Sequence, residues 1–200
     1  MPQWVPLAAY LNNKGFPLYR NTAARYLPTG KAFLEDMLDA MEQAERFIFL
    51  EYFIMAEGEI WHRLTDILRR KSGQGVEGKL IFDYFGSMLR MPAEEVDSLR
   101  RAGVEVMIFN PVHHYVNRLY FNYRDHRKIT CIDGDTAYTG GANLADEYAD
   151  IIRRFGYWKD CGLRLEGEGA WGLTREFIYM WERLGGQLHS EHDYYRPMHQ

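Results

Sequence analysis

The sequence has few cysteines, no excess of positive charge and no long hydrophobic run. Cys131 and Cys161 are the two cysteines in 200 residues, and they show neither metal-ligand spacing nor a disulfide framework. We therefore expect two buried thiols in a reducing compartment. The formal net charge is −4, whereas a DNA-binding domain is usually strongly basic on at least one face. This balance argues against nucleic acid as a partner.

The hydrophobic runs are too short to cross a membrane. The longest, residues 47–55, is interrupted by Glu51 and falls well below the roughly 20 residues that span a bilayer. The sequence shows no signal peptide. With 46% hydrophobic and 15% aromatic residues, the chain can bury the core of one domain, which we expect to be soluble.

Helical and strand patterns alternate along the chain. Apolar residues at helical spacing predict helices, whereas runs rich in β-branched and aromatic residues predict strands. The expected helices cover residues 31–45, 59–71, 93–102 and 168–184, and the expected strands cover residues 46–54, 76–84, 104–110 and 157–165. This alternation favours an α/β sandwich with a largely parallel central sheet.

Three regions differ in character. Residues 1–29 contain four prolines and are expected to be irregular and to wrap the domain. Residues 30–186 carry the alternating pattern and form the expected domain, with Thr29 as the cap of its first helix. Residues 187–200 are polar and are interpreted as a tail or the start of a linker.

The stretch that carries the chemistry is residues 122–143, which read NYRDHRKITCIDGDTAYTGGAN. Two short β-segments flank the turn Asp133-Gly134-Asp135, which predicts a hairpin. His126 and Lys128 lie two residues apart on the first segment, so their side chains point to the same face and can meet one ligand group. Asp133 lies at the strand end with the other parity, where we expect it to orient its neighbours and cap the turn.

An imidazole beside an ammonium group suits phosphoester chemistry. The ring nitrogen can attack phosphorus while the cation stabilises charge on the non-bridging oxygens. We expect Gly140 and Gly141 to let backbone approach the same oxygens, with Asn143 as an amide donor. The arrangement calls for no metal and no cofactor, and the histidines and cysteines form no ligand cluster of recognised spacing. The H-x-K pair alone is also typical of a solvated strand face.

The wider spacing is far more specific. His126, Lys128, Asp133 and the following G-G-x-N fit the pattern H-x-K-(x)4-D-(x)6-G-G-x-N, which resembles the signature of the phospholipase D superfamily. The runs N-Y-R-D-H-R-K, G-G-A-N-L-A-D-E-Y and R-F-G-Y-W-K-D resemble bacterial cardiolipin synthases, and the similarity covers nearly the whole chain. Those enzymes usually begin with membrane-spanning segments and carry two such motifs. This chain has one motif and resembles the N-terminal catalytic half.

The resemblance implies a phospholipase D-type αβα fold and a phosphatidyltransferase. Such an enzyme moves a phosphatidyl group from one phosphatidylglycerol to another through a phosphohistidine and releases glycerol. The implied catalytic residues are His126, Lys128, Asp133 and Asp160, the last being the aspartate of W-K-D. A carboxylate at that place in the superfamily holds the nucleophilic histidine in one tautomer.

The same resemblance implies the partners and the location. The partners are an anionic phospholipid such as phosphatidylglycerol, the membrane surface, and a second half-domain in the same chain or a second copy of this one. The full-length parent is expected at the cytoplasmic face of the bacterial membrane.

Three further residues are candidates for substrate binding. Glu51 and Tyr52 lie in a segment that leads toward the active-site cleft in cardiolipin synthases, and Asp83 begins the loop D-Y-F-G-S after a predicted strand. Glu51 could equally be solvated at a strand end, and Asp83 could be a helix cap. The aromatic and basic residues 111–121 fit a lipid entrance and a packed surface loop equally well.

Two alternative functions stay open at this point. One is a phosphodiesterase or nuclease of the same superfamily, whose site two single-motif chains form as a homodimer. The other is a non-catalytic half-domain that binds anionic lipid or a partner chain. One histidine cannot easily be both nucleophile and general acid, so the isolated monomer is expected to be nearly inactive.

Overall fold

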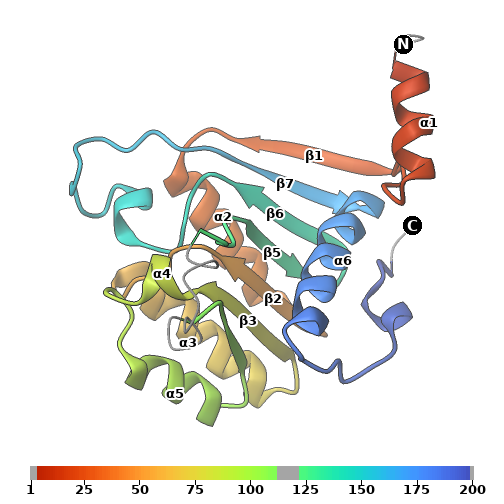
Figure 1. Ribbon diagram of the computed structural model, residues 1–200. Helices are drawn as coiled ribbons and strands as arrows, with labels where there is room; N and C mark the ends of the chain where they lie inside the picture. Colours follow the sequence, from red (N-terminus) through yellow and green to blue (C-terminus); the bar gives the residue numbers. More distant parts are fainter. Residues whose placement is uncertain (1–3, 112–121, 199–200) are drawn as a thin grey trace.

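A seven-stranded sheet forms the middle layer of the computed structural model, which describes residues 4–111 and 122–198. Helices α2, α3 and α5 cover one face of the sheet and α6 covers the other (Figure 1). The strands are β1 (Thr22–Leu27), β2 (Phe47–Tyr52), β3 (Glu77–Asp83), β4 (Glu105–Phe109), β5 (Lys128–Ile132), β6 (Thr136–Gly140) and β7 (Gly162–Gly167). The helices are α1 (Val5–Asn13), α2 (Gly30–Glu42), α3 (Glu59–Gly73), α4 (Tyr84–Ser87), α5 (Ala93–Arg101) and α6 (Glu168–Arg183), with 3-10 turns η4 (Asp146–Ala149) and η5 (His192–Tyr195).

The sheet is mixed. Its order is β1-β7-β6-β5-β2-β3-β4, and only the β2–β3 and β3–β4 pairs are parallel. The other four pairs are antiparallel. The predicted α/β sandwich is therefore confirmed, but the prediction of a largely parallel sheet is wrong. Parallel neighbours need a crossover, usually a helix, and in the described chain such helices lie between β2, β3 and β4.

The local patterns behind the predicted helices are confirmed. Thr29 Oγ1 accepts a hydrogen bond from Ala32 N at 3.0 Å, and α2 begins at the next residue. The apolar stripe of α2 is buried, namely Phe33, Leu34, Met37, Leu38 and Met41. Capping and amphipathic spacing are short-range signals, so they are readable from sequence.

The predicted hairpin is also present. β5 pairs with β6, with Ile132 opposite Thr136, so three residues form the connection. Asp133 and Gly134 have φ values of 55° and 78°, a left-handed region that aspartate tolerates and glycine favours. Cys131 in this hairpin is buried as expected, whereas Cys161 is exposed.

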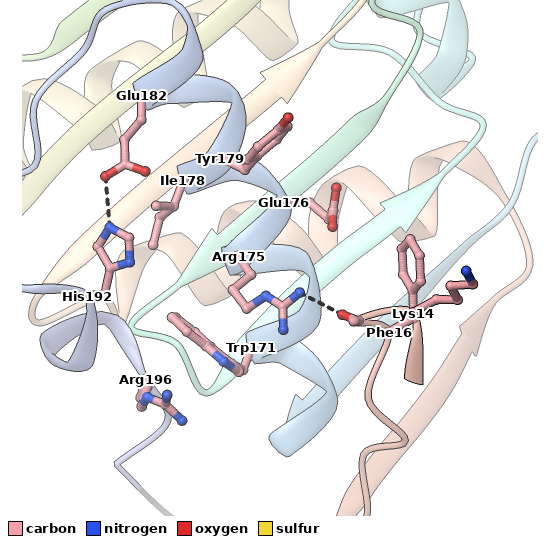
Figure 2. Close-up of a pocket in the computed structure, with 11 residues that line it drawn as sticks. Lys14, Phe16, Trp171, Arg175, Glu176, Ile178, Tyr179, Glu182, His192 and Arg196 are labelled. Carbon is pink, nitrogen blue, oxygen red and sulfur yellow. Dashed lines mark hydrogen bonds and ion pairs between the residues drawn. The ribbon is translucent and has the colours of Figure 1, made fainter. Parts of the chain in front are cut away.

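The N-terminal segment has more regular structure than the sequence predicted. Residues 4–29 contain helix α1, which has no buried residue, and strand β1, which pairs with β7 at the edge of the sheet. Helix α1 projects from the corner of the sheet rather than wrapping the domain (Figure 1). The segment after it is fastened to α6, since Arg175 Nη2 donates to the Gly15 carbonyl oxygen at 3.1 Å (Figure 2).

The C-terminal segment returns to the sheet instead of leaving the domain as a linker. Tyr195 in η5 is fully buried, and its ring centroid lies 5.2 Å from that of Phe47 and 5.4 Å from that of Phe49. Its hydroxyl donates to Glu77 Oε2 at 2.8 Å. His192 Nε2 lies 2.8 Å from Glu182 Oε1 of α6 (Figure 2). Within the described residues, no helix is both long and apolar enough to traverse a bilayer.

We predict that Tyr195→Ala destabilises the domain by about 3 kcal/mol, because it leaves a cavity under Phe47 and Phe49. Urea denaturation of the purified chain measures this, and Tyr157→Ala is the matched control because Tyr157 is 63% exposed. Equal unfolding midpoints for the two variants would show that residues 187–198 do not belong to the folded unit.

Candidate active site

Residues from several strands meet at one end of the sheet. This end carries the last residues of β2 and β3, the first residue of β5 and the last of β6, because β5 runs antiparallel to β2 and to β6. His126 lies two residues before β5, and Asp160 lies two residues before β7. The carboxyl ends of parallel strands are where open α/β sheets commonly bind ligands.

His126 is exposed and stands beside the ammonium group of Lys128. Lys128 Nζ lies 3.1 Å from His126 Nδ1 and donates to the His126 carbonyl oxygen at 2.8 Å. The ring of Phe53, just after β2, packs against the imidazole with centroids 4.7 Å apart. Lys128 Nζ also lies 5.5 Å from the Phe53 ring centroid. The structure therefore brings the predicted histidine and lysine together, on an aromatic support that the sequence did not reveal.

The surroundings keep the imidazole neutral. Partial burial, and then the Lys128 charge, lower the pKa of His126 below its usual 6.5. Burial lowers the pKa of Lys128 to about 8, against the opposing charges of Asp125 and Asp160. At neutral pH the site thus holds a neutral ring beside a mostly charged ammonium group.

Asp83 fixes the segment that carries His126. Its fully buried carboxylate accepts hydrogen bonds from Phe85 N and Gly86 N at the start of α4, at 2.8 and 3.2 Å. It also accepts from Asp125 N at 3.0 Å and lies 3.2 Å from Arg124 Nη1. Asp83 therefore joins the end of β3 to the residues just before His126. These contacts match the alternative role of a helix cap and also anchor the segment before His126. None of them supports the predicted role of Asp83 in substrate binding.

A second group of charges lies on the α6 face of the sheet. Arg127 Nη2 lies 2.6 Å from Glu51 Oε1, Arg127 Nε lies 3.2 Å from Asp125 Oδ1, and Arg127 Nη1 lies 3.5 Å from Glu176 Oε2 of α6. Asp125 and Arg127 were not predicted as site residues. The run D-H-R-K could have indicated them. On an extended segment Asp125 and Arg127 alternate with His126 and Lys128, so their side chains face the other side.

Glu51 is fully buried in this group rather than solvated at a strand end. Burial, reinforced by the neighbouring Asp125 carboxylate, raises the pKa of Glu51 to about 10. The approach of Arg127 does not align an N–H with either Glu51 oxygen, so neither oxygen is hydrogen-bonded among the described residues. Burial and Asp125 therefore favour the protonated form of Glu51, behind the segment that carries His126, whereas the nearby Arg127 favours the carboxylate.

Tyr52 belongs to the core and does not face a ligand. It is fully buried, and its hydroxyl lies 2.8 Å from Thr130 Oγ1 and donates to Met37 Sδ at 3.3 Å. Burial raises the pKa of the Tyr52 hydroxyl above its usual 10. The structure does not support the predicted substrate contact.

Asp133 lies at the opposite end of β5 from His126. Its carboxylate accepts hydrogen bonds from the backbone N–H groups of Glu45, Arg46 and Phe47, at 2.8, 2.8 and 2.9 Å. These contacts anchor the start of β2 to the hairpin turn. This position matches the expected orienting role and leaves Asp133 about 20 Å from His126 along an extended strand, outside the site.

Gly140, the last residue of β6, and Gly141, which follows it, allow close packing inside the protein. A Cβ on Gly140 would lie 2.6 Å from the Cys161 carbonyl oxygen, and one on Gly141 would clash with the Asp160 carboxylate. Gly141 N donates to the Cys161 carbonyl oxygen at 3.1 Å. The absence of side chains on Gly140 and Gly141 thus lets the segment before β7 approach β6. These contacts do not support the prediction that the two glycines let backbone approach a phosphate.

Asn143 joins two loops and is almost completely buried. Its Oδ1 accepts from Ile54 N at 3.0 Å, and its Nδ2 donates to the Tyr148 hydroxyl at 2.9 Å. Both ends of the amide are therefore engaged within the protein. Asn143 holds the chain after β2 next to the chain after β6, and the predicted role as a donor to substrate finds no support in this position.

The predicted pairing of Asp160 with His126 is not formed. Asp160 Oδ2 accepts from Trp158 Nε1 at 3.2 Å and Oδ1 accepts from Cys161 N at 2.8 Å. Between these two described residues the structure shows neither a hydrogen bond nor an ion pair, although the Asp160 charge acts on Lys128. Asp160 also precedes β7 instead of lying within a strand. Its evident electrostatic role is to favour the charged form of the lysine.

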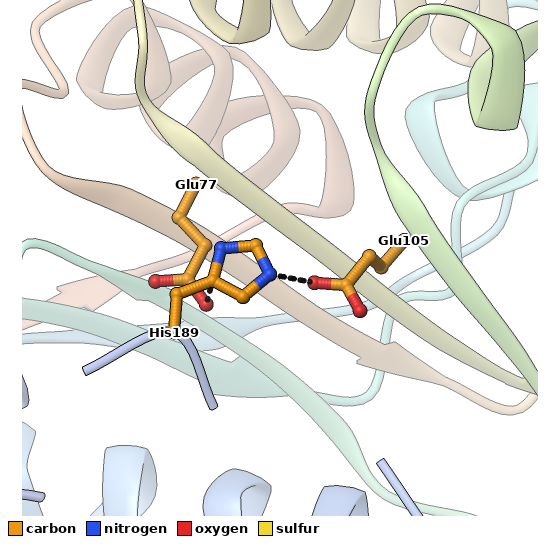
Figure 3. Close-up of side chains that lie close together, drawn as sticks. All are labelled: Glu77, Glu105 and His189. Atoms are coloured by element: carbon orange, nitrogen blue, oxygen red, sulfur yellow. Dashed lines mark ion pairs between the residues drawn. The ribbon is translucent and has the colours of Figure 1, made fainter. Parts of the chain in front are cut away.

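A possible metal-ligand group lies at the other end of β3. Glu77, Glu105 and His189 place one ligand atom each within 4.8 Å of one another (Figure 3). The fully buried Lys79 ammonium occupies this group, 3.1 Å from Glu77 Oε1 and in an ion pair with Glu105. A lysine therefore already supplies the positive charge that a metal would bring, and the group fastens His189 to the sheet.

The fold and the H-x-K site together define a phospholipase D-type α/β domain. The family model described as "Cardiolipin synthase, PLD-like domain" matches residues 37–152. A cardiolipin synthase from Oceanobacillus iheyensis is 35% identical over 96% of this chain, and an uncharacterized protein from Streptococcus mutans is 44% identical over 88% of it. The chain therefore belongs to the cardiolipin synthase family of phospholipase D-like domains. It spans 38% of the length of each of these two relatives.

Solved structures agree on the fold. A phosphatidylserine synthase from Haemophilus influenzae superposes with a TM-score of 0.60 at 16% identity, covering 86% of this chain and 41% of that one. A phospholipase D family member, Nuc from Salmonella typhimurium, superposes with a TM-score of 0.57 at 15% identity, covering 82% of this chain and 93% of that one. The predicted phospholipase D-type fold is thus confirmed.

We predict that Lys128→Gln raises the pKa of His126 toward 6.5, because it removes the positive charge that opposes protonation of the ring. The wild-type ring is neutral at pH 7 and becomes charged only as the pH falls below its lowered pKa, so the variant should titrate at higher pH. NMR titration of the His126 ring proton measures this. Lys31→Gln removes an exposed charge on α2 and should leave the titration curve of His126 unchanged. A His126 pKa that stays constant or falls in Lys128→Gln contradicts the assignment.

Proposed function

We propose that this chain is a phosphatidyltransferase half-domain that makes cardiolipin and glycerol from two phosphatidylglycerol molecules. The observation that carries the proposal is the contact of His126 Nδ1 with Lys128 Nζ, 3.1 Å apart at the functional end of the sheet. Membership of the cardiolipin synthase family supports a phospholipid as the donor.

The chemistry requires two histidines. In the first step the nitrogen of one imidazole bonds to the phosphorus of the donor, and the bond from phosphorus to the oxygen of the head-group glycerol breaks. The other histidine gives that oxygen a proton, and glycerol leaves. In the second step the acceptor's glycerol hydroxyl loses its proton to that second histidine, and its oxygen displaces the imidazole. His126 supplies one of these two rings.

Lys128 links substrate binding to the state of the ring. A charged ammonium group can only donate hydrogen bonds, so in this structure Nδ1 of neutral His126 accepts and Nε2 carries the hydrogen. The phosphate oxygens of a bound lipid compete for the same ammonium group. Once Lys128 turns to them, Nδ1 is free to carry the hydrogen and Nε2 presents its lone pair. The arrangement works without metal or cofactor.

The second histidine comes from another half-domain, either in the same chain or in a second copy. His126 is exposed, so a partner can reach it. The chain covers only 38% of its cardiolipin synthase relative, which is consistent with a site completed by further protein. The reaction takes place at a bacterial membrane surface, where the lipid substrate lies, and we place it at the cytoplasmic face.

A second candidate is a phosphodiesterase built from two copies of one half-domain. The observation that favours it is that the fold match covers 93% of the Nuc chain from Salmonella typhimurium, so that chain is about one such unit. Light scattering of this chain, combined with assays on phosphatidylglycerol and on DNA, separates the two candidates.

We predict that His126→Ala abolishes cardiolipin formation by the domain assembled with its second half. Lys128→Ala should lower the rate on the order of 100-fold to 1,000-fold, as loss of one charge-stabilising donor does. Lys31→Ala is the control for expression and folding. Wild-type turnover of His126→Ala, with intact circular dichroism, would refute the proposal.

We predict that kcat/KM falls as the pH rises through about 8, because Lys128 then loses the proton that makes it a cation. The Asp160 charge raises the pKa of Lys128, so Asp160→Asn should lower that pKa further. The falling limb of the pH profile should therefore move to lower pH in Asp160→Asn. An unmoved limb would mean that Asp160 does not act through the lysine.

A further inference from the structure

A cavity of about 740 Å³ lies directly beside His126. Its walls are the end of β4 at Phe109, the segment Arg124–Arg127, and one face of α6. Cavities of this size suit small ligands or the polar part of a lipid. The cavity is distinct from the Lys128 side of His126, because Lys128 does not line it.

The α6 wall is a stripe of four residues at helical spacing, namely Glu176, Tyr179, Met180 and Arg183. The stripe begins at the histidine segment, since Glu176 Oε2 lies 3.5 Å from Arg127 Nη1. It ends at Arg183, which lies about 10 Å further along the helix at 1.5 Å per residue. One wall thus runs from Arg127, the neighbour of His126 in the chain, to the guanidinium group of Arg183.

The three arginines of the cavity are not equivalent. Arg124 lies 3.2 Å from an Asp83 oxygen, and Arg127 is paired with Glu51, Asp125 and Glu176. Arg183 is exposed and donates to the Tyr179 hydroxyl at 3.2 Å. Within residues 4–111 and 122–198 no carboxylate forms an ion pair with Arg183. A guanidinium group in this setting is well placed to bind an anion from the solvent side.

We propose that this cavity is the subsite for the second phospholipid, with Arg183 binding the phosphate that does not react. The inference rests on the proposed function. Joining two phosphatidylglycerol molecules brings two negative phosphates close together, and each needs a cation to offset their repulsion. Lys128 serves the phosphate under attack, and Arg183 serves the acceptor's phosphate. Phe109, Tyr179 and Met180 then contact the acceptor's glycerol and the first atoms of its acyl chains.

Binding of short-chain phosphatidylglycerol to the 200-residue chain tests this directly. Dihexanoyl phosphatidylglycerol is added below its micelle concentration, and the methyl NMR signal of Met180 reports occupancy of the cavity. Arg183→Gln should raise the apparent Kd at Met180 about tenfold, the loss of one charge-assisted contact, and Arg183→Lys should restore part of it. Arg101→Gln removes an exposed arginine on α5 and is the matched control.

Three outcomes would overturn the inference. They are an equal Kd in Arg183→Gln and wild type, equal binding of dihexanoyl phosphatidylcholine at the Met180 signal, and tighter binding there of a single-stranded oligonucleotide. The readout does not depend on turnover. Failure of the assembled domain to make cardiolipin would count against the proposed function, whereas the Met180 titration separately decides whether the cavity binds an anionic lipid.

For the assembled enzyme, an acceptor subsite has a further consequence. Arg183→Gln should lower the ratio of cardiolipin to phosphatidic acid, because water can still replace the second lipid after the first step. Arg101→Gln should leave the ratio unchanged. An unchanged ratio in Arg183→Gln, with both products reduced equally, would assign the cavity to the donor lipid and overturn the acceptor assignment.

Discussion

The antiparallel pairing of β2 with β5 is the constraint on which the site depends. It joins the parallel strands β2, β3 and β4 to the antiparallel strands β5, β6, β7 and β1. Because Tyr52 pairs with Lys128 and Ile48 with Ile132, the start of β5 meets the carboxyl ends of β2 and β3. A parallel β5 would carry His126 to the opposite end, away from Phe53 and Asp83. The direction of one strand pair thus decides which groups the histidine meets.

This placement gathers buried charge around one short segment. Asp83, Asp125 and Lys128 are each at most 5% exposed, and Glu51 is fully buried. Burying charged groups costs free energy unless partners and hydrogen bonds compensate, and apolar residues in their place are often equally stable or more stable. Asp83 is well compensated by backbone N–H donors, whereas the Glu51 oxygens are not hydrogen-bonded in the described chain. A cost of this kind at one end of the sheet is typical of a functional site.

The short-range features of the fold could be predicted from the sequence, and the long-range ones could not. The α2 stripe, its Thr29 cap and the β5–β6 hairpin depend on neighbours within a few residues, and His126 and Lys128 share a face because strands alternate. Strand direction, the edge position of β1 and the return of Tyr195 depend on contacts between distant parts of the chain. The prolines of residues 1–29 predicted an irregular segment, but the structure contains α1 and β1 there. The polar composition of residues 187–200 predicted a tail or linker, but Tyr195 packs against the sheet.

The motif of residues 126–143 combines residues that lie at the site with residues that support the fold. The spacing that identified Asp133, Gly141 and Asn143 is set by their structural contacts: three backbone donors for Asp133, room for Asp160 at Gly141, and two loops joined by Asn143. A motif records every residue that the arrangement requires, so it does not separate reacting groups from supporting ones. Only geometry makes that separation. Below the exposed imidazole of His126 the supporting contacts are largely satisfied within the domain, so the imidazole is the part of this arrangement that remains open to the solvent.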